Sequence, residues 1–255
     1  MPNWLLLAYA GVVGACVGSF LNVCVYRWPE GLSVIRPRSR CPACETPIRA
    51  RNNVPVLGWL LLRGKCRQCG ARISVQYPLI ELVTASLWVA AALRFGLSWQ
   101  TLSVAIFFTL LLGIALTDAR TYIIPDQFTW GGLVIGLLLS LAPGGIAPLQ
   151  SLIGAVVGFV LLYVVAVVGE WAFKKPAMGG GDIKMLAMIG AFLGWQGVLL
   201  TLFLGALFGS LIFGPISART GKLVPFGIFL ALGAGIAEPW GNAIVQWYLR
   251  TFVAG

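Results

Sequence analysis

The chain contains only three aspartates, and each lies beside apolar sequence. Asp118 and Asp126 lie in TDARTYIIPDQF, and Asp182 follows three glycines in MGGGDIKML. A carboxylate close to membrane hydrocarbon is costly, and such residues are retained mainly where they have a function. The sequence has no histidine, which excludes Ser-His-Asp, Cys-His and H-E-x-x-H sites. Acid–base chemistry must therefore use carboxylates, lysine, tyrosine or cysteine.

Two carboxyl groups held close together can hydrolyse a peptide bond without histidine. Such groups cannot both ionise cheaply, so they share one proton and titrate as a unit. One then accepts a proton from water while the other donates to the carbonyl oxygen. Because helix starts favour anions and helix ends disfavour them, we expect Asp182 to carry more of the charge and Asp118 more of the proton. Glycines at 179–181 would let an extended peptide approach the backbone closely.

Each aspartate also has a purely structural interpretation. Asp182 could be a helix N-cap after the glycine turn, and Asp118 could pair with Arg120. Asp126 could begin a turn after Pro125. GGGDIK is not a phosphate-binding loop, because the G-K-[ST] ending is missing. The choice between these interpretations and a shared site depends on where the helices place the aspartates.

The composition predicts an all-α polytopic membrane protein. Of 255 residues, 59% are hydrophobic and only 10% are charged, and the mean hydropathy is +0.90. A soluble domain has about 25% charged residues. A spanning helix needs about 20 apolar residues. We therefore expect about eight transmembrane helices, separated by turn signals such as APGG and KKPAMGGG. The expected helices lie at about 4–26, 77–95, 101–117, 128–142, 149–172, 183–196, 198–215 and 224–248.

The distribution of Lys and Arg predicts the orientation of these helices. Segments 27–76, 118–127, 173–184 and 216–223 hold 16 of the 18 Lys and Arg residues, and eight spans place all four on one side. That side is cytoplasmic by the positive-inside rule. The net charge of +10 then indicates contact with anionic lipid headgroups and not with nucleic acid. Asp118 ends the third span and Asp182 opens the sixth, so both reach the cytoplasmic face and can share one site.

The polar loop 27–76 contains two cysteine pairs, CPAC and KCRQCG. Two C-x2-C pairs separated by 21 residues lie just beyond the usual zinc-knuckle spacing. Four thiolates form a closed tetrahedral site, so one structural Zn²⁺ is expected, and a reducing cytoplasm argues against the alternative of disulfides. The predicted ligands are Cys41, Cys44, Cys66 and Cys69. We thus divide the chain into a first transmembrane helix (1–26), this loop (27–76) and a membrane domain (77–255, with its core at 101–215).

Five segments of the sequence resemble the type IV prepilin peptidase family. The resemblance runs in order from about residue 10 to 215. The segments are GSFLNVCVYRWP (18–29), RSRCPAC (38–44), RNNVPVLGWLLLRGKCRQCGARISVQYPLIE (51–81), TDARTYIIPD (117–126) and GGGDIKMLAMIGAFLGW (179–195).

The Lys and Arg distribution places the N-terminus on the periplasmic side, and the resemblance implies a G-x-G-D aspartyl protease of the bacterial inner membrane. Such enzymes cut the short basic leader from prepilins and pseudopilins at the cytoplasmic face. The family's catalytic aspartates fall on Asp118 and Asp182, and its motif glycines fall on Gly179 and Gly181. Its tetracysteine zinc motif falls on the four cysteines named above. Asp126 matches a recurring acid that we do not count in the catalytic pair.

Many members of this family also methylate the new N-terminal residue with S-adenosylmethionine. That activity is expected here from the resemblance alone. The residues that bind the methyl donor are unknown; Glu45, Arg51 and Asn53 of the polar loop are candidates, or they form a solvated surface. A peptidase without methyltransferase activity is therefore the first alternative. The sequence does not indicate which pilins are processed, whether they build a pilus, a secretion machine or a DNA-uptake apparatus, or what the oligomeric state is.

Two further alternatives belong to other classes of function. A proton-coupled transporter would place its carboxylates at the membrane midplane, usually between inverted repeats. A Ser/Lys peptidase would use Lys184 or Lys222. No serine lies within four residues of either in the sequence, so such a site would need a serine brought close by the fold.

Overall fold

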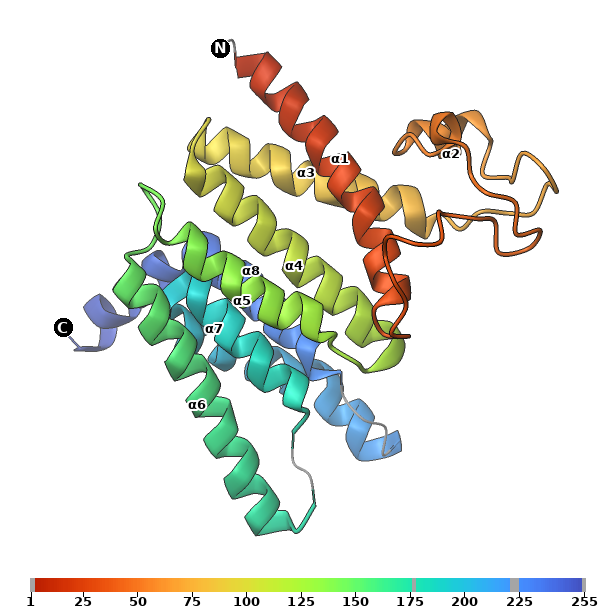
Figure 1. Cartoon of the computed structure of the whole chain (residues 1–255). Helices are drawn as coiled ribbons and strands as arrows, with labels where there is room; N and C mark the ends of the chain where they lie inside the picture. Colours follow the sequence, from red (N-terminus) through yellow and green to blue (C-terminus); the bar gives the residue numbers. More distant parts are fainter. Residues whose placement is uncertain (1–2, 176–177, 221–224, 254–255) are drawn as a thin grey trace. The chain divides into compact units, whose positions relative to one another are not determined.

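The computed structural model describes residues 3–175, 178–220 and 225–253, and these residues form helices joined by turns and loops. No strand occurs among them, which confirms the all-α prediction. The main helices (Figure 1) are α1 (Asn3–Arg27), α2 (Leu57–Leu61), α3 (Gln76–Phe95), α4 (Trp99–Thr121), α5 (Asp126–Leu139), α6 (Pro148–Phe173), α7 (Gly180–Thr220) and α8 (Phe226–Tyr248). A short 3₁₀ helix, η1 (Ala50–Asn52), and a short π-helix, η2 (Leu249–Val253), complete the described elements.

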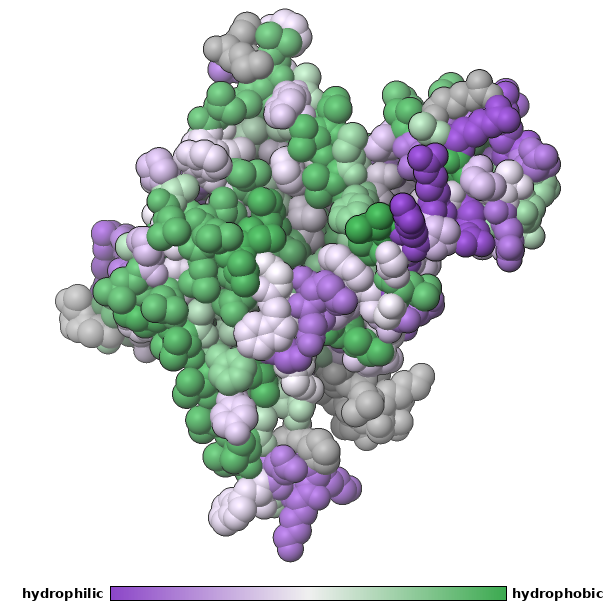
Figure 2. Space-filling view, viewed as in Figure 1, coloured by the Kyte–Doolittle hydropathy of each residue, from purple (hydrophilic) through white to green (hydrophobic). Residues whose placement is uncertain are grey.

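Six of the described helices are long and apolar enough to cross a membrane: α1, α3, α4, α6, α7 as far as Phe213, and α8 with its extension to Phe252. The chain is thus a polytopic membrane protein. Large apolar side chains such as Val134, Val160 and Phe203 are exposed on the helices, as lipid contact requires. Figure 2 shows hydrophobic side chains over most of the visible helical surface and hydrophilic ones gathered on the loop that contains α2.

The predicted spans 183–196 and 198–215 both fall within α7, which is interrupted at Gly194. This residue has φ 70° and ψ 179°, a conformation that is easily accessible only to glycine. The break divides α7 into two helical arms. α5, with 14 residues, is shorter than an untilted span requires. The number of eight crossings therefore stays a prediction, although a helix covers most of each predicted stretch.

The second arm of α7 runs back toward the level at which the first arm begins. A Cβ on Gly181, in the first arm, would lie 2.9 Å from Ile124, and a Cβ on Gly227, at the start of α8, would lie 2.8 Å from the same side chain. Gly209 of the second arm lies beside Phe229 of α8. The end of the second arm therefore returns to the level at which the first arm begins, where Asp182 lies.

Glycines hold the first arm of α7 against α6 at backbone contact. A Cβ on Gly154 would overlap the carbonyl oxygen of Gly190, and a Cβ on Gly158 would overlap the backbone at Leu186 in the same way. Ser151 adds a buried hydrogen bond of 2.6 Å from its hydroxyl to the Ala191 carbonyl. Close packing of small residues is a main source of helix association in lipid. It fixes the arm that carries Asp182.

The chain divides into two compact units, residues 1–109 and 110–255, with the boundary inside α4. In the first unit, α1 packs on α3 through Gly14 and Gly18, each of which leaves no room for a side chain. Asn22 of α1 donates a hydrogen bond of 3.1 Å to the Tyr77 carbonyl. The second unit contains the end of α4 and all of α5–α8, including all three aspartates.

Candidate functional site

Asp118 lies in the last turn of α4 and is buried, with 5% of its surface exposed. Its Oδ2 accepts a hydrogen bond of 3.2 Å from the backbone N–H of Ile228, in the first turn of α8. The side chain also lies against Gly227, where a Cβ would be only 2.9 Å from the same oxygen. The position of this carboxylate is therefore set by α4 and α8 together.

Asp182 lies in the first turn of α7 and is half-buried. Its Oδ1 is fully shielded from solvent and has no hydrogen-bond partner among the described residues. A Cβ on Gly179 would lie 3.2 Å from its Oδ2. Gly180 has nothing within 4 Å of its Cβ position, so the glycine segment leaves open space just before Asp182 in the chain.

The structure brings Asp118 and Asp182 into one site within the second unit. Gly227 lies against both the Asp118 carboxylate and Ile124, which belongs to the linker between α4 and α5. Gly181, which precedes Asp182, lies against Ile124 as well. Segments that are far apart in the sequence thus meet here. This is the arrangement expected of an acid–base carboxyl pair, and its catalytic role is proposed below.

Asp126 does not join the carboxyl pair, because it is held by Lys184. The Lys184 Nζ donates to Asp126 Oδ1 at 2.6 Å, with both side chains partly exposed. Asp126 opens α5, and Lys184 lies two residues after Asp182 on α7. The ion pair therefore connects two elements next to the site. It also occupies the lysine that the Ser/Lys alternative requires; Lys222, its other candidate, lies outside the described residues.

A charge exchange tests this connection. We expect Asp126→Asn and Lys184→Met each to lower activity about two- to fivefold, the range of an exposed ion pair. The double variant Asp126→Lys, Lys184→Asp should recover most of the loss, because the pair is re-formed with opposite polarity. Peptide-cleavage kinetics on the three purified variants measure this. If Lys184→Met abolished the activity and the exchange restored none of it, Lys184 would be a catalytic base instead.

The four loop cysteines form a cluster in the first unit, as predicted. The sulfur atoms of Cys41, Cys44, Cys66 and Cys69 all lie within 4.8 Å of one another. The two closest pairs, Cys41 with Cys69 and Cys44 with Cys66, are 3.9 and 4.0 Å apart. A tetrahedral Zn²⁺ with Zn–S distances of about 2.3 Å holds its sulfurs about 3.8 Å apart. The donor set and its spacing therefore fit a metal ion.

The two cysteine pairs are built on the same backbone pattern, 25 residues apart. Arg40 pairs with Pro47 in an isolated bridge, and Lys65 pairs with Arg72. In each knuckle the first cysteine's N–H donates to a carbonyl five residues later, and its carbonyl accepts an N–H four residues later. The residue that donates the latter has positive φ in both knuckles. Sequence analysis missed this local repeat, since little besides the cysteines is shared.

Hydrogen bonds in the same turns favour the thiolate form of two of the four cysteines. Hydrogen bonds from the side chain and the backbone of Thr46 lower the pKa of the Cys44 thiol from its ordinary value to about 6. Backbone hydrogen bonds from Cys69 and Gln68 also lower the pKa of the Cys66 thiol. Metal ligands must be thiolates, and a lowered pKa favours the thiolate at neutral pH.

Sequence analysis missed a buried polar group in the first unit. Glu81 is buried within the apolar run of α3 and accepts a hydrogen bond of 2.7 Å from the Val56 N–H. It lies against Gly18, one turn before Asn22, whose Oδ1 is buried without a partner among the described residues. A glutamate inside an apolar span was the available signal. Glu45 instead forms a surface ion pair of 3.8 Å with Arg40.

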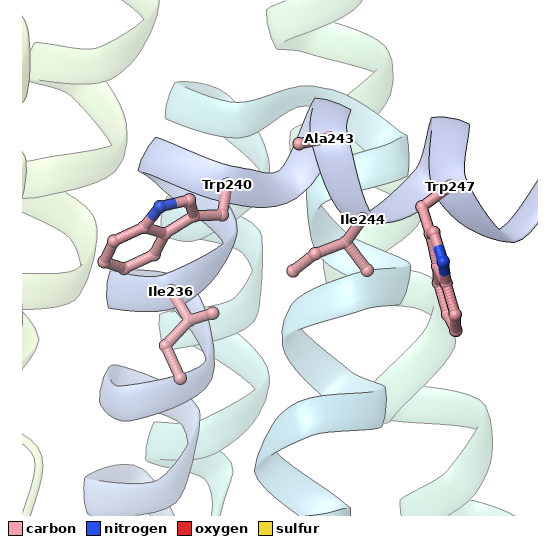
Figure 3. A pocket seen from close by; sticks show the side chains of 5 residues that line it. All are labelled: Ile236, Trp240, Ala243, Ile244 and Trp247. Atoms are coloured by element: carbon pink, nitrogen blue, oxygen red, sulfur yellow. The ribbon is translucent and has the colours of Figure 1, made fainter.

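An apolar pocket lies on a different part of the second unit. It is lined by Ile236, Trp240, Ala243, Ile244 and Trp247, all from α8 (Figure 3). None of these side chains can transfer a proton at neutral pH or ligate a metal. The pocket is therefore not the candidate site.

Comparison with known proteins matches both units to described families. Residues 12–95 match the Bacterial Peptidase A24 N-terminal domain, and residues 105–214 match the Type IV leader peptidase family. Among similar curated proteins, one from Aeromonas hydrophila is 38% identical, covering 98% of this chain and 96% of its own length. One from Bacillus subtilis (strain 168) is 36% identical, covering 96% and 98%. Both are named "Prepilin leader peptidase/N-methyltransferase". No solved structure matches.

Proposed function

This chain belongs to the type IV leader peptidase family, and from that premise we propose that it cuts leader peptides from prepilins or pseudopilins and methylates the new N-terminus. It is a multi-pass enzyme of the bacterial inner membrane. The distribution of Lys and Arg supports a periplasmic N-terminus and a cytoplasmic active site.

The observation that carries the peptidase proposal is the meeting of Asp118 and Asp182 beside Gly179–Gly181. A buried carboxyl pair that shares one proton can deprotonate water and protonate the scissile carbonyl oxygen in the same step. The glycines supply the second requirement, because an extended peptide must approach the backbone closely to reach both groups. Any side chain at Gly179 would contact the Asp182 carboxylate.

The substrate class fits this position at the helix ends. A prepilin has a short basic leader followed by an apolar helix. The helix can enter the bilayer while its leader stays in the cytoplasm, and this places the junction at the depth of the aspartates. Helical peptide bonds are closed to attack, so a glycine at the junction helps the chain to unwind.

The methyl transfer is supported by the names of the relatives, with S-adenosylmethionine as the proposed donor. Cys41, Cys44, Cys66 and Cys69 would hold one Zn²⁺. Four protein ligands leave no position for water on the metal, so its proposed role is to fold the loop and not to activate a nucleophile.

One experiment tests both activities. The purified enzyme is incubated with a prepilin and S-adenosylmethionine, and the N-terminus of the product is analysed by mass spectrometry. We expect a product that lacks the leader and carries one methyl group on its new N-terminal residue. A cleaved product without the methyl group would support the peptidase-only alternative, and an uncleaved substrate would contradict the peptidase proposal.

A further inference from the structure

The first turn of α8 lacks a cap of its own and meets the carboxylate of Asp118. The N-cap residue, Pro225, makes no side-chain capping bond. The first four N–H groups of a helix have no intrahelical acceptor, and the one at Ile228 donates to Asp118 Oδ2 at 3.2 Å. Asp118 therefore caps α8 from a different helix.

The two aspartates differ in how well they can carry a negative charge. Asp118 Oδ2 accepts a backbone N–H and faces the positive end of the α8 dipole, both of which favour an anion. Asp182 Oδ1 is buried without a donor among the described residues. An ionised oxygen in that position would lose its hydration without compensation. The geometry therefore favours the charge on Asp118.

We propose that the start of α8 is part of the catalytic site, where it positions Asp118 as the resting carboxylate of the pair while Asp182 holds the proton. This inference rests on the proposed peptidase function. It reverses the expectation from the sequence, which placed the charge on Asp182 because of the helix ends at α4 and α7. That expectation did not include α8, which supplies a second helix terminus to Asp118.

The assignment gives the two carboxyl groups opposite roles in each half of the reaction. Asp118 takes a proton from water as the water oxygen bonds to the scissile carbonyl carbon, and Asp182 gives its proton to the carbonyl oxygen. When this intermediate collapses, the carbonyl re-forms and returns a proton to Asp182. The C–N bond breaks, and the leaving amine takes the proton held by Asp118. The pair ends in its starting state.

Among the described residues, few charged groups lie where they could change which of the two aspartates carries the negative charge. Within this part of the chain, Asp182 on α7 is the titratable group of a neighbouring element that belongs to the same site as Asp118. Lys184 of the same helix is bound to Asp126 of α5. Arg120 lies two residues beyond Asp118 on α4, and the first turn of α8 carries no charged residue.

The proposal extends the active site beyond the segment that matches the peptidase family. That match ends at residue 214, and α8 begins at Phe226. What α8 contributes to the site is the backbone N–H of Ile228 and the absence of a side chain at Gly227. Gly227 and Ile228 are therefore positioning residues, which act through Asp118.

Ile228→Pro removes the donated hydrogen bond at a place where a helix tolerates proline. Residue 228 lies in the first turn, so its N–H has no intrahelical acceptor to lose. We expect kcat to fall about ten- to a hundredfold, the range for a hydrogen bond to a charged group, with little change in KM. The acid limb of the pH–rate profile should move up by about one pH unit, because the anion loses a donor.

Gly227→Ala tests the same contact from the side-chain direction. Its methyl group would meet both Asp118 Oδ2 and Ile124, so it should displace the carboxylate and raise the acid limb as well. Gly131→Ala is the matched control, since α5 leaves the space around Gly131 empty and its activity should be unchanged. Ile228→Ala keeps the N–H and should keep the wild-type acid limb.

Infrared spectra with ¹³C-labelled aspartate provide a readout that does not depend on turnover, because the chain has only three aspartates. Ile228→Pro, or Gly227→Ala if the proline variant does not fold, should shift an ionised carboxylate band. A shift of the protonated carboxyl band instead would overturn the assignment. A folded Ile228→Pro enzyme with the wild-type kcat and acid limb would also overturn it, whereas failure of the wild type to cleave prepilin would reject the proposed function itself.

Discussion

Asp118→Asn and Asp182→Asn are each expected to lower the kcat/KM for prepilin cleavage by about a thousandfold or more. Each replacement keeps the shape of the side chain but removes its ability to exchange a proton. General acid–base catalysis by one positioned group contributes about 10² to 10⁴ in rate. The two groups act as a unit, so the double variant should be only slightly slower than either single variant. Initial rates with purified enzyme in detergent measure the effect.

Asp126→Asn is the matched control, because Asp126 is the third aspartate of the chain and its carboxylate is bound by Lys184. It should lose only the few-fold activity expected from its ion pair. Loss of fold would imitate loss of catalysis, so the melting temperature and the zinc content of each variant are compared with the wild type. A folded Asp118→Asn or Asp182→Asn enzyme that still cleaves prepilin at a comparable rate would refute the catalytic pair.

The sequence predicted this pair because the information that it needs is contained in composition and charge. Apolar runs mark the helices, and Lys and Arg place their ends on one side of the membrane. Asp118, at the C-terminal end of its helix, and Asp182, at the N-terminal end of its helix, are then expected at the same face of the membrane. The interpretation of each aspartate by itself, as a cap or a surface partner, was incomplete. Asp118 is a cap in the structure, but it caps a helix that begins more than a hundred residues later.

Nothing in the sequence indicates that α8 contributes to the site. The group at the site is a backbone N–H, which every residue except proline carries. Gly227 lies there among the many glycines of an apolar chain. Only the three-dimensional structure shows that the missing side chain of Gly227 makes room for a carboxylate. No described group lies beside Gly131, so the missing side chain there has no such effect. The expected charge distribution differs from the one proposed here for the same reason, because it considered only the two helices that carry the aspartates.

The break in α7 was partly predictable. The sequence analysis divided this segment into the spans 183–196 and 198–215, and Gly194 lies close to that division. Its positive φ could not be inferred from a GW dipeptide, because glycines also fill the close contact between α6 and α7. A glycine that permits a turn and one that permits packing, such as Gly190, look the same in the sequence.

Cys41→Ser is expected to reduce the zinc content from about one ion per chain to almost none. The four sulfurs are spaced for a tetrahedral ion, and removal of one thiolate leaves an incomplete set of ligands. Metal binding and folding of such a loop are coupled, so the variant should also expose residues 27–76 to proteolysis. Metal analysis by mass spectrometry and limited digestion measure the two effects, and a strong chelator should reproduce both in the wild type.

Cys16→Ser is the appropriate control, because Cys16 lies in α1 and is not part of the cluster. It should retain the metal and the protease resistance of the loop. The fold of the loop has few other sources of stability, since Cys41 is its principal buried apolar side chain and Ile35, Leu57 and Leu61 are exposed. If wild-type protein purified without a chelator held no stoichiometric metal, or if Cys41→Ser retained it, the cluster would not be a zinc site.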